Sequence, residues 1–328
     1  MPAVISHYLL AKRFSLKEGE LASSHPSFDD FLEKNFVYFA LGSQGPDPLF
    51  FTGIIPFRGL HLPTAMKKIG NQIHKTDAKK YFRLLIEECF KIEPEKHDFG
   101  EQKQFKAFVF GQFAHYLLDK YCHPYVLYES GFDDDGKITG EYHYLHSKIE
   151  TEIDYCLAKK YKTDHILDKP GDLLKCIRTS SRNDPLAKID AHLVPVLKKT
   201  FDLKYLPKHM YSNGLKNYRT ILNYTNGGSS LRVALFKKTN LAAMRMPKEV
   251  KEDVLNENRE KWYHPVSNTP SNASFLELHS KAFDELQSLF IDIMENGFSY
   301  EVFLRHMDDK DYYGCVPNSK WMFKKNIK

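Results

Sequence analysis

The spacing of apolar residues predicts helices along most of the chain. Apolar residues recur at three- and four-residue intervals, whereas the alternation typical of strands is sparse and no internal repeat is evident. The sequence therefore predicts an all-α fold. Besides a short opening helix that carries His7, we expect helices over residues 23–41, 69–92, 102–122, 142–157, 186–200, 211–224, 242–260 and 273–296.

Glycine and proline residues indicate where these helices are interrupted. The first long helix runs into GSQGPDPLFF, where prolines on both sides of Asp47 restrict the backbone. This stiff loop either presents the Asp47 carboxylate to a site or only ends the helix. Residues 56–70 are predicted to be a loop. Residues 130–141, SGFDDDGKITGE, are predicted to form a surface turn, because they lack the ordered oxygen ligands of an EF-hand.

Composition places the chain among folded globular proteins. Its 328 residues are 42% hydrophobic and 14% aromatic, which is ample for a core. The net charge of +5 is spread along the chain. Such a mild excess is compatible with anionic substrates or peripheral contact with a membrane surface, but it is too diffuse to predict specific nucleic-acid binding.

The cysteines and the N-terminal segment indicate the cellular compartment in which the protein is expected. The N-terminus lacks the pattern of a secretory signal, and no stretch reaches the length of a membrane span. The five cysteines show no CxxC spacing and lie mostly in apolar surroundings, which predicts buried free thiols in a reducing compartment. We therefore expect a cytoplasmic protein. The cysteines are Cys89, Cys122, Cys156, Cys176 and Cys315.

Histidine and acidic residues at four-residue spacing predict a metal site. His115, Asp119 and His123 follow one another at this interval and would form a row on one face of a helix. His146 and Glu150 repeat the spacing on the next predicted helix. Imidazole and carboxylate ligands of this kind suit Zn²⁺, and the second helix could complete its coordination from across a gap.

Ion pairs on a helix surface are the alternative explanation. With 15 histidines in the chain, some will lie four residues from an acidic residue by chance. The neighbours of His115 argue against this alternative, because they predict a buried helix, and buried charges need partners or a metal. These neighbours are Phe108, Phe110, Phe113, Leu117 and Leu118.

Several segments together resemble the zinc-dependent phospholipase C family, in its intracellular bacterial branch. They are MPAVISHYLL, GSQGPDPLFF, IGNQIH, GQFAHYLLDKYCHPY and HSKIETEID, which cover roughly residues 1–160. The resemblance implies a multi-helix bundle of the phospholipase C and single-strand nuclease type. We expect a zinc-binding core over residues 1–160 and a helical C-terminal extension, residues 161–328, packed on it.

The resemblance also implies which residues bind two or three zinc ions. His61 is an alternative to His74, because it lies closer to the spacing seen in secreted members, but IGNQIH matches the intracellular branch better. Secreted members complete the third zinc with a terminal amine, whereas this chain begins Met-Pro. The first zinc would take Asp47, His74, His115 and Asp119, the second His123, His146 and Glu150, and the third His7 with Asp119 bridging.

The predicted function is that of a hydrolase that cleaves phosphodiesters, most simply phospholipids, with a metal-bound hydroxide. Asp47 is the candidate catalytic residue, as a group that orients the nucleophile or acts as general base. One alternative is a nuclease or a small-molecule phosphoesterase with the same metal cluster. Another is a module that binds lipid or a partner without turnover, which would have closed metal coordination.

Overall fold

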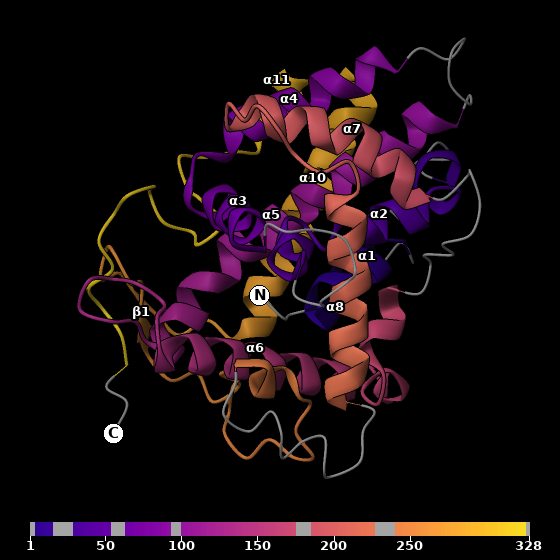
Figure 1. Cartoon of the computed structure of the whole chain (residues 1–328). Helices are drawn as coiled ribbons and strands as arrows, with labels where there is room; N and C mark the ends of the chain where they lie inside the picture. The colour runs from indigo at the N-terminus through magenta and orange to yellow at the C-terminus, as the bar shows by residue number, and fades with distance from the viewer. Residues whose placement is uncertain are drawn as a thin grey trace.

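The long helix α5, Glu101–Ser130, forms the centre of the molecule (Figure 1). The computed structural model describes residues 4–15, 29–53, 63–92, 100–174, 185–226 and 240–325. Nearly every residue of α5 from Phe105 to Leu127 is buried, on all sides of the helix. A helix that is buried all round needs neighbours on every side. Among these neighbours are α2, Phe36–Gly42, and α10, Phe275–Asn296.

The remaining helices surround this centre. They are α1 Val4–Ser15, α3 Pro63–Lys75, α4 Ala78–Lys91, α6 Glu141–Lys160, α7 Pro185–Thr200, α8 Met210–Asn226 and α11 Tyr300–Arg305. Short turns of other helix types lie at Asp29–Glu33, Asp47–Phe51, Asp164–Ile166, Pro170–Leu174 and Asn240–Met244. The strands β1, Trp262–Tyr263, and β2, Pro270–Ser271, pair antiparallel, with Trp262 opposite Ser271. The prediction of an all-α fold is confirmed for the described residues.

Two glycines allow α2 to cross α5 closely. A Cβ added to Gly42 would lie 2.1 Å from the carbonyl oxygen of Phe108, and one added to Gly111 would lie 2.3 Å from that of Phe39. Gln112 of α5 then donates to the carbonyls of Gly42 and Gly45, each at 3.1 Å. This crossing fixes the loop that leads to Asp47 against the central helix.

The predicted boundaries are correct to within two residues for α7, α8 and α10. The 130–141 segment contains the expected turn, which is mostly exposed from residue 134 onward, whereas Ser130, Gly131 and Phe132 are buried. The predicted loop over 56–70 is wrong for residues 63–70, because α3 already begins at Pro63, a residue suited to the first helical position. The predicted helix over 69–92 is divided at Thr76 and Asp77 into α3 and α4. The central helix continues past its internal Pro124 to Ser130.

Two further helix predictions are corrected. Residues 242–260 are not a helix beyond the short turn that ends at Met244. There Asp253 accepts from the backbone N–H groups of Glu257 and Asn258, and Asn256 has a positive φ, so side chains compete with helical hydrogen bonding. Within the predicted helix over 23–41, the described part is broken at Asn35, whose side chain donates to the carbonyl of Phe31.

Candidate metal centre

The eight residues predicted as metal ligands lie together around Asp119, and all eight are buried. They come from α1, the turn at Asp47, the end of α3, the middle of α5 and the start of α6. Three trios have potential ligand atoms within 4.8 Å of one another. The trios are Asp47, His74 and His115; His7, His115 and Asp119; and His123, His146 and Glu150.

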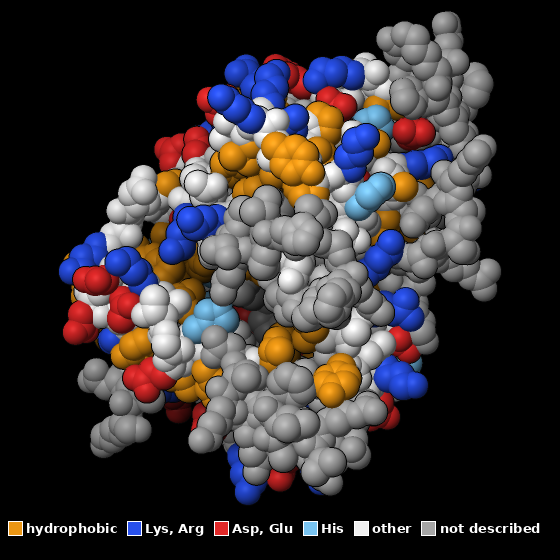
Figure 2. All heavy atoms as spheres, viewed as in Figure 1, with side chains coloured by type: hydrophobic (Ala, Val, Ile, Leu, Met, Phe, Trp, Pro, Cys, Tyr) orange, Lys and Arg blue, Asp and Glu red, His pale blue; other side chains and the backbone are white. Residues whose placement is uncertain are grey.

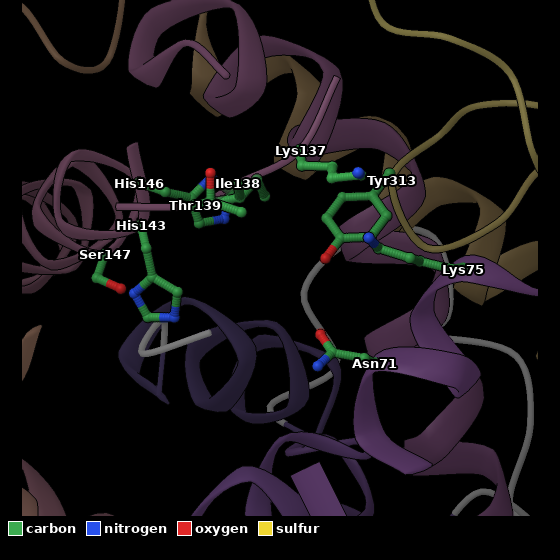
Figure 3. Close-up of a pocket in the computed structure, with 9 residues that line it drawn as sticks. All are labelled: Asn71, Lys75, Lys137, Ile138, Thr139, His143, His146, Ser147 and Tyr313. Carbon is green, nitrogen blue, oxygen red and sulfur yellow. The ribbon is translucent and has the colours of Figure 1, made fainter. Parts of the chain in front are cut away.

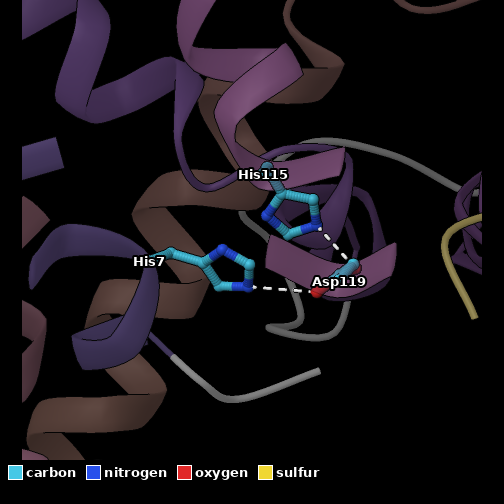
Figure 4. Close-up of side chains that lie close together, drawn as sticks. All are labelled: His7, His115 and Asp119. Carbon is cyan, nitrogen blue, oxygen red and sulfur yellow. Dashed lines mark ion pairs between the residues drawn. The ribbon is translucent and has the colours of Figure 1, made fainter. Parts of the chain in front are cut away.

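Asp119 faces four histidines. Its oxygens lie 3.1 Å from Nε2 of His115, 3.3 Å from Nε2 of His7 and 3.6 Å from Nε2 of His74. Nδ1 of His123 is also 3.6 Å away. Figure 4 shows His7 and His115 converging on this carboxylate from α1 and α5. The two rings are stacked, with their centroids 3.9 Å apart. The structure thus brings Asp119 within 4 Å of histidines from all three trios, whereas its role as a bridging ligand stays a prediction.

Two further carboxylates complete the cluster. Oδ1 of Asp47 lies 3.3 Å from Nε2 of His74 and 4.0 Å from Nε2 of His115. On the opposite side, Oε1 of Glu150 lies 3.4 Å from Nε2 of His123 and 3.3 Å from Nε2 of His146. The two predicted helices therefore face each other across the site, as their i, i+4 spacing indicated. His61, the alternative to His74, lies outside the described residues.

Backbone carbonyls fix the orientation of three histidine rings. Nδ1 of His74 donates to Gly70 at 2.8 Å, Nδ1 of His115 to Ser43 at 3.1 Å, and Nδ1 of His123 to Tyr312 at 2.8 Å. A carbonyl can only accept, so the proton of a neutral ring lies on Nδ1 and the lone pair on Nε2. Metal-binding histidines are usually oriented in this way.

The cluster brings histidine nitrogens and carboxylate oxygens together away from solvent. When these rings are neutral, their Nε2 lone pairs face carboxylate oxygens, and neither group can donate a hydrogen bond to the other, so a proton or a cation must lie between them. Nε2 of His115, Nδ1 of His7 and Oδ1 of Asp47 are buried with no hydrogen-bond partner within the described structure. Buried polar atoms in this state are costly unless a cation satisfies them. The donor set of histidine nitrogen and carboxylate oxygen fits zinc.

The pKa shifts of the buried carboxylates and histidines also indicate that the cluster is stabilised by positive charge. Burial would raise the pKa of Asp119, but the charges of His115 and His123 hold it well below its usual range. Burial opposes protonation of His123, yet the Asp119 and Glu150 carboxylates raise its pKa to about 9. Burial and the neighbouring His115 lower the pKa of His7 to about 4. The carboxylates are therefore ionised, and positive charge between them stabilises the cluster.

One supporting residue was not anticipated from the sequence. Asp154 of α6 accepts from the backbone N–H groups of Ile5 and Ser6 at 2.9 and 2.8 Å, and from the Ser6 hydroxyl. It thereby holds the first turn of α1, which carries His7. The signal was present in HSKIETEID, because Asp154 follows Glu150 by four residues on the same helix.

Cys122, which is close to the ligand row in sequence, does not belong to any of the three trios. Burial raises the pKa of Cys122 well above its usual value, so it remains a thiol. Cys89, Cys122 and Cys315 are buried free thiols as predicted, Cys156 is half-buried, and Cys176 lies outside the described residues. The Tyr116 hydroxyl donates to the carbonyl of Lys310, beyond the cluster.

The helical bundle and its buried cluster of histidines and carboxylates have the features of a metal-binding protein. The model of the zinc dependent phospholipase C family matches residues 1–191, more than half of the chain. The chain therefore belongs to the zinc-dependent phospholipase C family, whose members are phosphodiesterases and for which a phospholipid substrate is implied. No curated protein and no solved structure matched the chain. In the described part of the chain, no helix is long and apolar enough to span a membrane.

Proposed function

We propose that this zinc-dependent phospholipase C binds its metal ions through the three trios around Asp119. The observation that carries the proposal is the convergence of buried histidine nitrogens and carboxylate oxygens around Asp119. Asp47, His74 and His115 would hold one ion, and His123, His146 and Glu150 a second. His7, His115 and Asp119 would hold a third, with Asp119 shared. Bound zinc supplies an activated water and neutralises charge on the phosphate.

Asp47 is the proposed catalytic residue. Its Oδ1 has no hydrogen-bond donor in the described structure, and the prolines on either side hold its backbone in the turn Asp47–Phe51. Tyr211 of α8 donates to the carbonyl of Gly45 at 3.0 Å and keeps this loop in place. A carboxylate fixed in this way can orient a nucleophile or accept its proton.

The cellular setting is a further part of the proposal. The resemblance of MPAVISHYLL and IGNQIH to intracellular bacterial members supports an intracellular enzyme. The buried free thiols support a reducing compartment such as the cytoplasm. Peripheral contact with a membrane would bring such an enzyme to its lipid. Fractionation of the native cells with an antibody against the chain tests both statements.

The decisive experiment measures zinc per chain by elemental analysis, alongside hydrolysis of a chromogenic phosphodiester with and without chelator. We expect two or three zinc ions and turnover that the chelator abolishes. His115→Ala and Asp119→Ala should each lower the zinc content and reduce turnover by roughly 100-fold or more. His165→Ala is the matched control, because this histidine is exposed on the short turn Asp164–Ile166.

Other results would contradict the proposal in specific ways. Zinc bound tightly without turnover on any phosphodiester would indicate a binding module. Turnover on single-stranded DNA but not on phospholipids would indicate a nuclease. A chain that binds no metal after reconstitution would mean that the cluster is a set of buried ion pairs.

A further inference from the structure

A pocket of about 300 Å³ lies beside the trio of His123, His146 and Glu150. His146 belongs to both, since it lines the pocket and its Nε2 faces Glu150. Tyr313 also lines the pocket, and its ring lies 5.2 Å from that of His123. A phosphodiester whose phosphate lies at this trio would therefore place one substituent in the pocket.

Positive charge characterises the lining of this pocket. Lys75 at the end of α3 and Lys137 both line it, together with Asn71 and His143. Figure 3 shows the two lysines on the Tyr313 side of the pocket and His143 on the opposite side. Among the described residues, no carboxylate lines the pocket. A substituent with cationic character would meet repulsion here, whereas acceptor oxygens would find donors.

The turn between α5 and α6 forms one wall of the pocket. The Asp133 carboxylate accepts from the backbone N–H groups of Asp135 and Lys137 and from the Thr139 hydroxyl, the last at 2.6 Å. These bonds hold Lys137 and Thr139 at the pocket wall. Lys137 also pairs with Asp135 at 3.4 Å, but both side chains are exposed, and such pairs exchange readily for a ligand.

The chemistry of the lining distinguishes between head groups. A lysine ammonium offers three donors, and an asparagine amide or a hydroxyl can both donate and accept. Such groups bind the hydroxyls of glycerol or inositol. A quaternary ammonium such as choline has no donor or acceptor and is bound by several aromatic faces or a carboxylate. Among the described lining residues, Tyr313 is the only one with a phenyl or indole ring, so the several such faces that would surround a choline group are missing.

From this we infer that the pocket formed by α3, the Asp133–Thr139 turn and Tyr313 selects a hydroxyl-bearing head group of an anionic phospholipid over choline. This inference rests on the proposed function, because it takes the phosphate to lie at the zinc site. It gives a role to a turn that the sequence alone marked only as a surface feature.

The test compares zinc-loaded enzyme on dihexanoyl phosphatidylglycerol and dihexanoyl phosphatidylcholine, both kept monomeric so that attraction to a charged membrane plays no part. We expect a higher kcat/KM for the glycerol lipid. Lys75→Gln and Lys137→Gln should each lower kcat/KM for that lipid by roughly tenfold, the loss expected for one charged hydrogen bond. The same variants should not lower turnover of the choline lipid, because they remove a charge that repels its quaternary ammonium.

Lys251→Gln is the matched control, because it removes the same charge from an exposed lysine outside the pocket. Calorimetric binding of the products, glycerol phosphate and phosphocholine, provides a readout independent of turnover. The lysine variants should weaken the binding of glycerol phosphate but not that of phosphocholine. Zinc content of every variant is measured to confirm that the metal centre is intact.

The outcomes separate this inference from the proposed function. Equal or faster cleavage of the choline lipid, or equal loss on both lipids in the lysine variants, would overturn head-group selection while the phospholipase activity stands. If neither lipid is cleaved by zinc-loaded enzyme, the proposed function itself fails. In that case, selective binding of glycerol phosphate that depends on both lysines would still support the pocket's preference, and its absence would refute it.

Discussion

At the scale of single residues, the metal cluster constrains even positions without a side chain. Gly45 has φ +55°, and a Cβ there would lie 2.3 Å from the ring of His115. No side chain fits at this distance unless the ring moves. The position of His115, a member of two trios, therefore depends on a glycine two residues before Asp47.

Gly45→Ala is expected to lower both stability and zinc content. The clash with the His115 ring adds to the cost of the positive φ, and together they should reduce the free energy of unfolding by about 2 kcal/mol or more. Gly140→Ala is a close control, because Gly140 has φ +54° and no atom lies within 4 Å of its added Cβ. The free energy of unfolding of each variant is measured with a chemical denaturant, and the difference between their losses gives the contribution of the clash with His115. Equal losses in the two would show that His115 is not constrained by Gly45.

His279 provides a pH-dependent term in stability. The Arg13 guanidinium lies 3.1 Å from Nδ1 of His279 and can only donate, so this nitrogen accepts and the ring is neutral. Burial, followed by the charge of Arg13, lowers the pKa of His279 to about 3. Below pH 6.5 the unfolded chain therefore binds a proton that the folded chain does not, and stability is lost as the pH falls.

The expected loss is about 1.4 kcal/mol for each pH unit between 6.5 and the folded pKa. Denaturant unfolding of the wild-type chain and of His279→Asn at pH 6.5 and 5 measures it. Between these two pH values, the stability of the variant should fall less than that of the wild type, by about 1.4 kcal/mol for each pH unit, whatever its overall stability. His165→Asn, an exposed histidine, should follow the wild type. Parallel behaviour of His279→Asn and wild type would contradict the assignment.

At the scale of elements, the position of α1 depends on one carboxylate of α6. Asp154 binds two backbone N–H groups and one hydroxyl of the first turn of α1. Burial raises the pKa of Asp154 to about 7, so these donors are needed to hold the charge. These bonds join the first turn of α1 to a residue of α6 that lies 148 to 149 positions away in sequence.

Asp154→Asn would replace one of the two carboxylate oxygens by an NH₂ group, which would face the backbone N–H groups of α1 and could not accept from them. We expect a loss of about 2 to 3 kcal/mol in stability, the cost of leaving buried groups unsatisfied. Zinc should fall by no more than one ion per chain, because only His7 is carried by α1. Thermal unfolding and elemental analysis measure these effects, with Asp134→Asn on the exposed turn as control. A loss of all zinc would show that Asp154 supports more than α1.

The elements also show what a sequence can reveal. The i, i+4 rows on α5 and α6 were predicted because helical geometry alone determines which side chains share a face. The carbonyls of Ser43, Gly70 and Tyr312 could not be predicted, since every residue has a carbonyl and only tertiary structure selects these three. The false helix over 242–260 arose because local side-chain bonds by Asp253 and Asn256 override the apolar pattern.

At the scale of the whole molecule, metal binding and folding should be linked. The candidate ligands extend from His7 to Glu150 and belong to five elements. The C-terminal part contributes as well, because Tyr312 accepts from His123 and a Cβ on Gly314 would lie 2.3 Å from the carbonyl oxygen of Lys120. How the chain divides into a core and a C-terminal region remains a prediction.

Removal of zinc by chelator should therefore lower the Tm by at least about 5 °C. Ions that bind the folded state and not the unfolded chain stabilise it by mass action, and a metal at 1,000 times its Kd contributes about 4 kcal/mol. Scanning calorimetry with and without chelator measures this, and added zinc should restore the original Tm. An unchanged Tm would mean that the cluster is stable without a cation.

The use of backbone carbonyls to orient three histidines has a consequence for how this enzyme can vary. A carbonyl survives any amino-acid replacement that keeps the local backbone, so the bond that orients each imidazole does not depend on the side chain at position 43, 70 or 312. Related enzymes could then retain an identical metal centre while these positions diverge. Searches for such enzymes should therefore weigh the ligands and the spacing of the turns above the identity of the residues that support them.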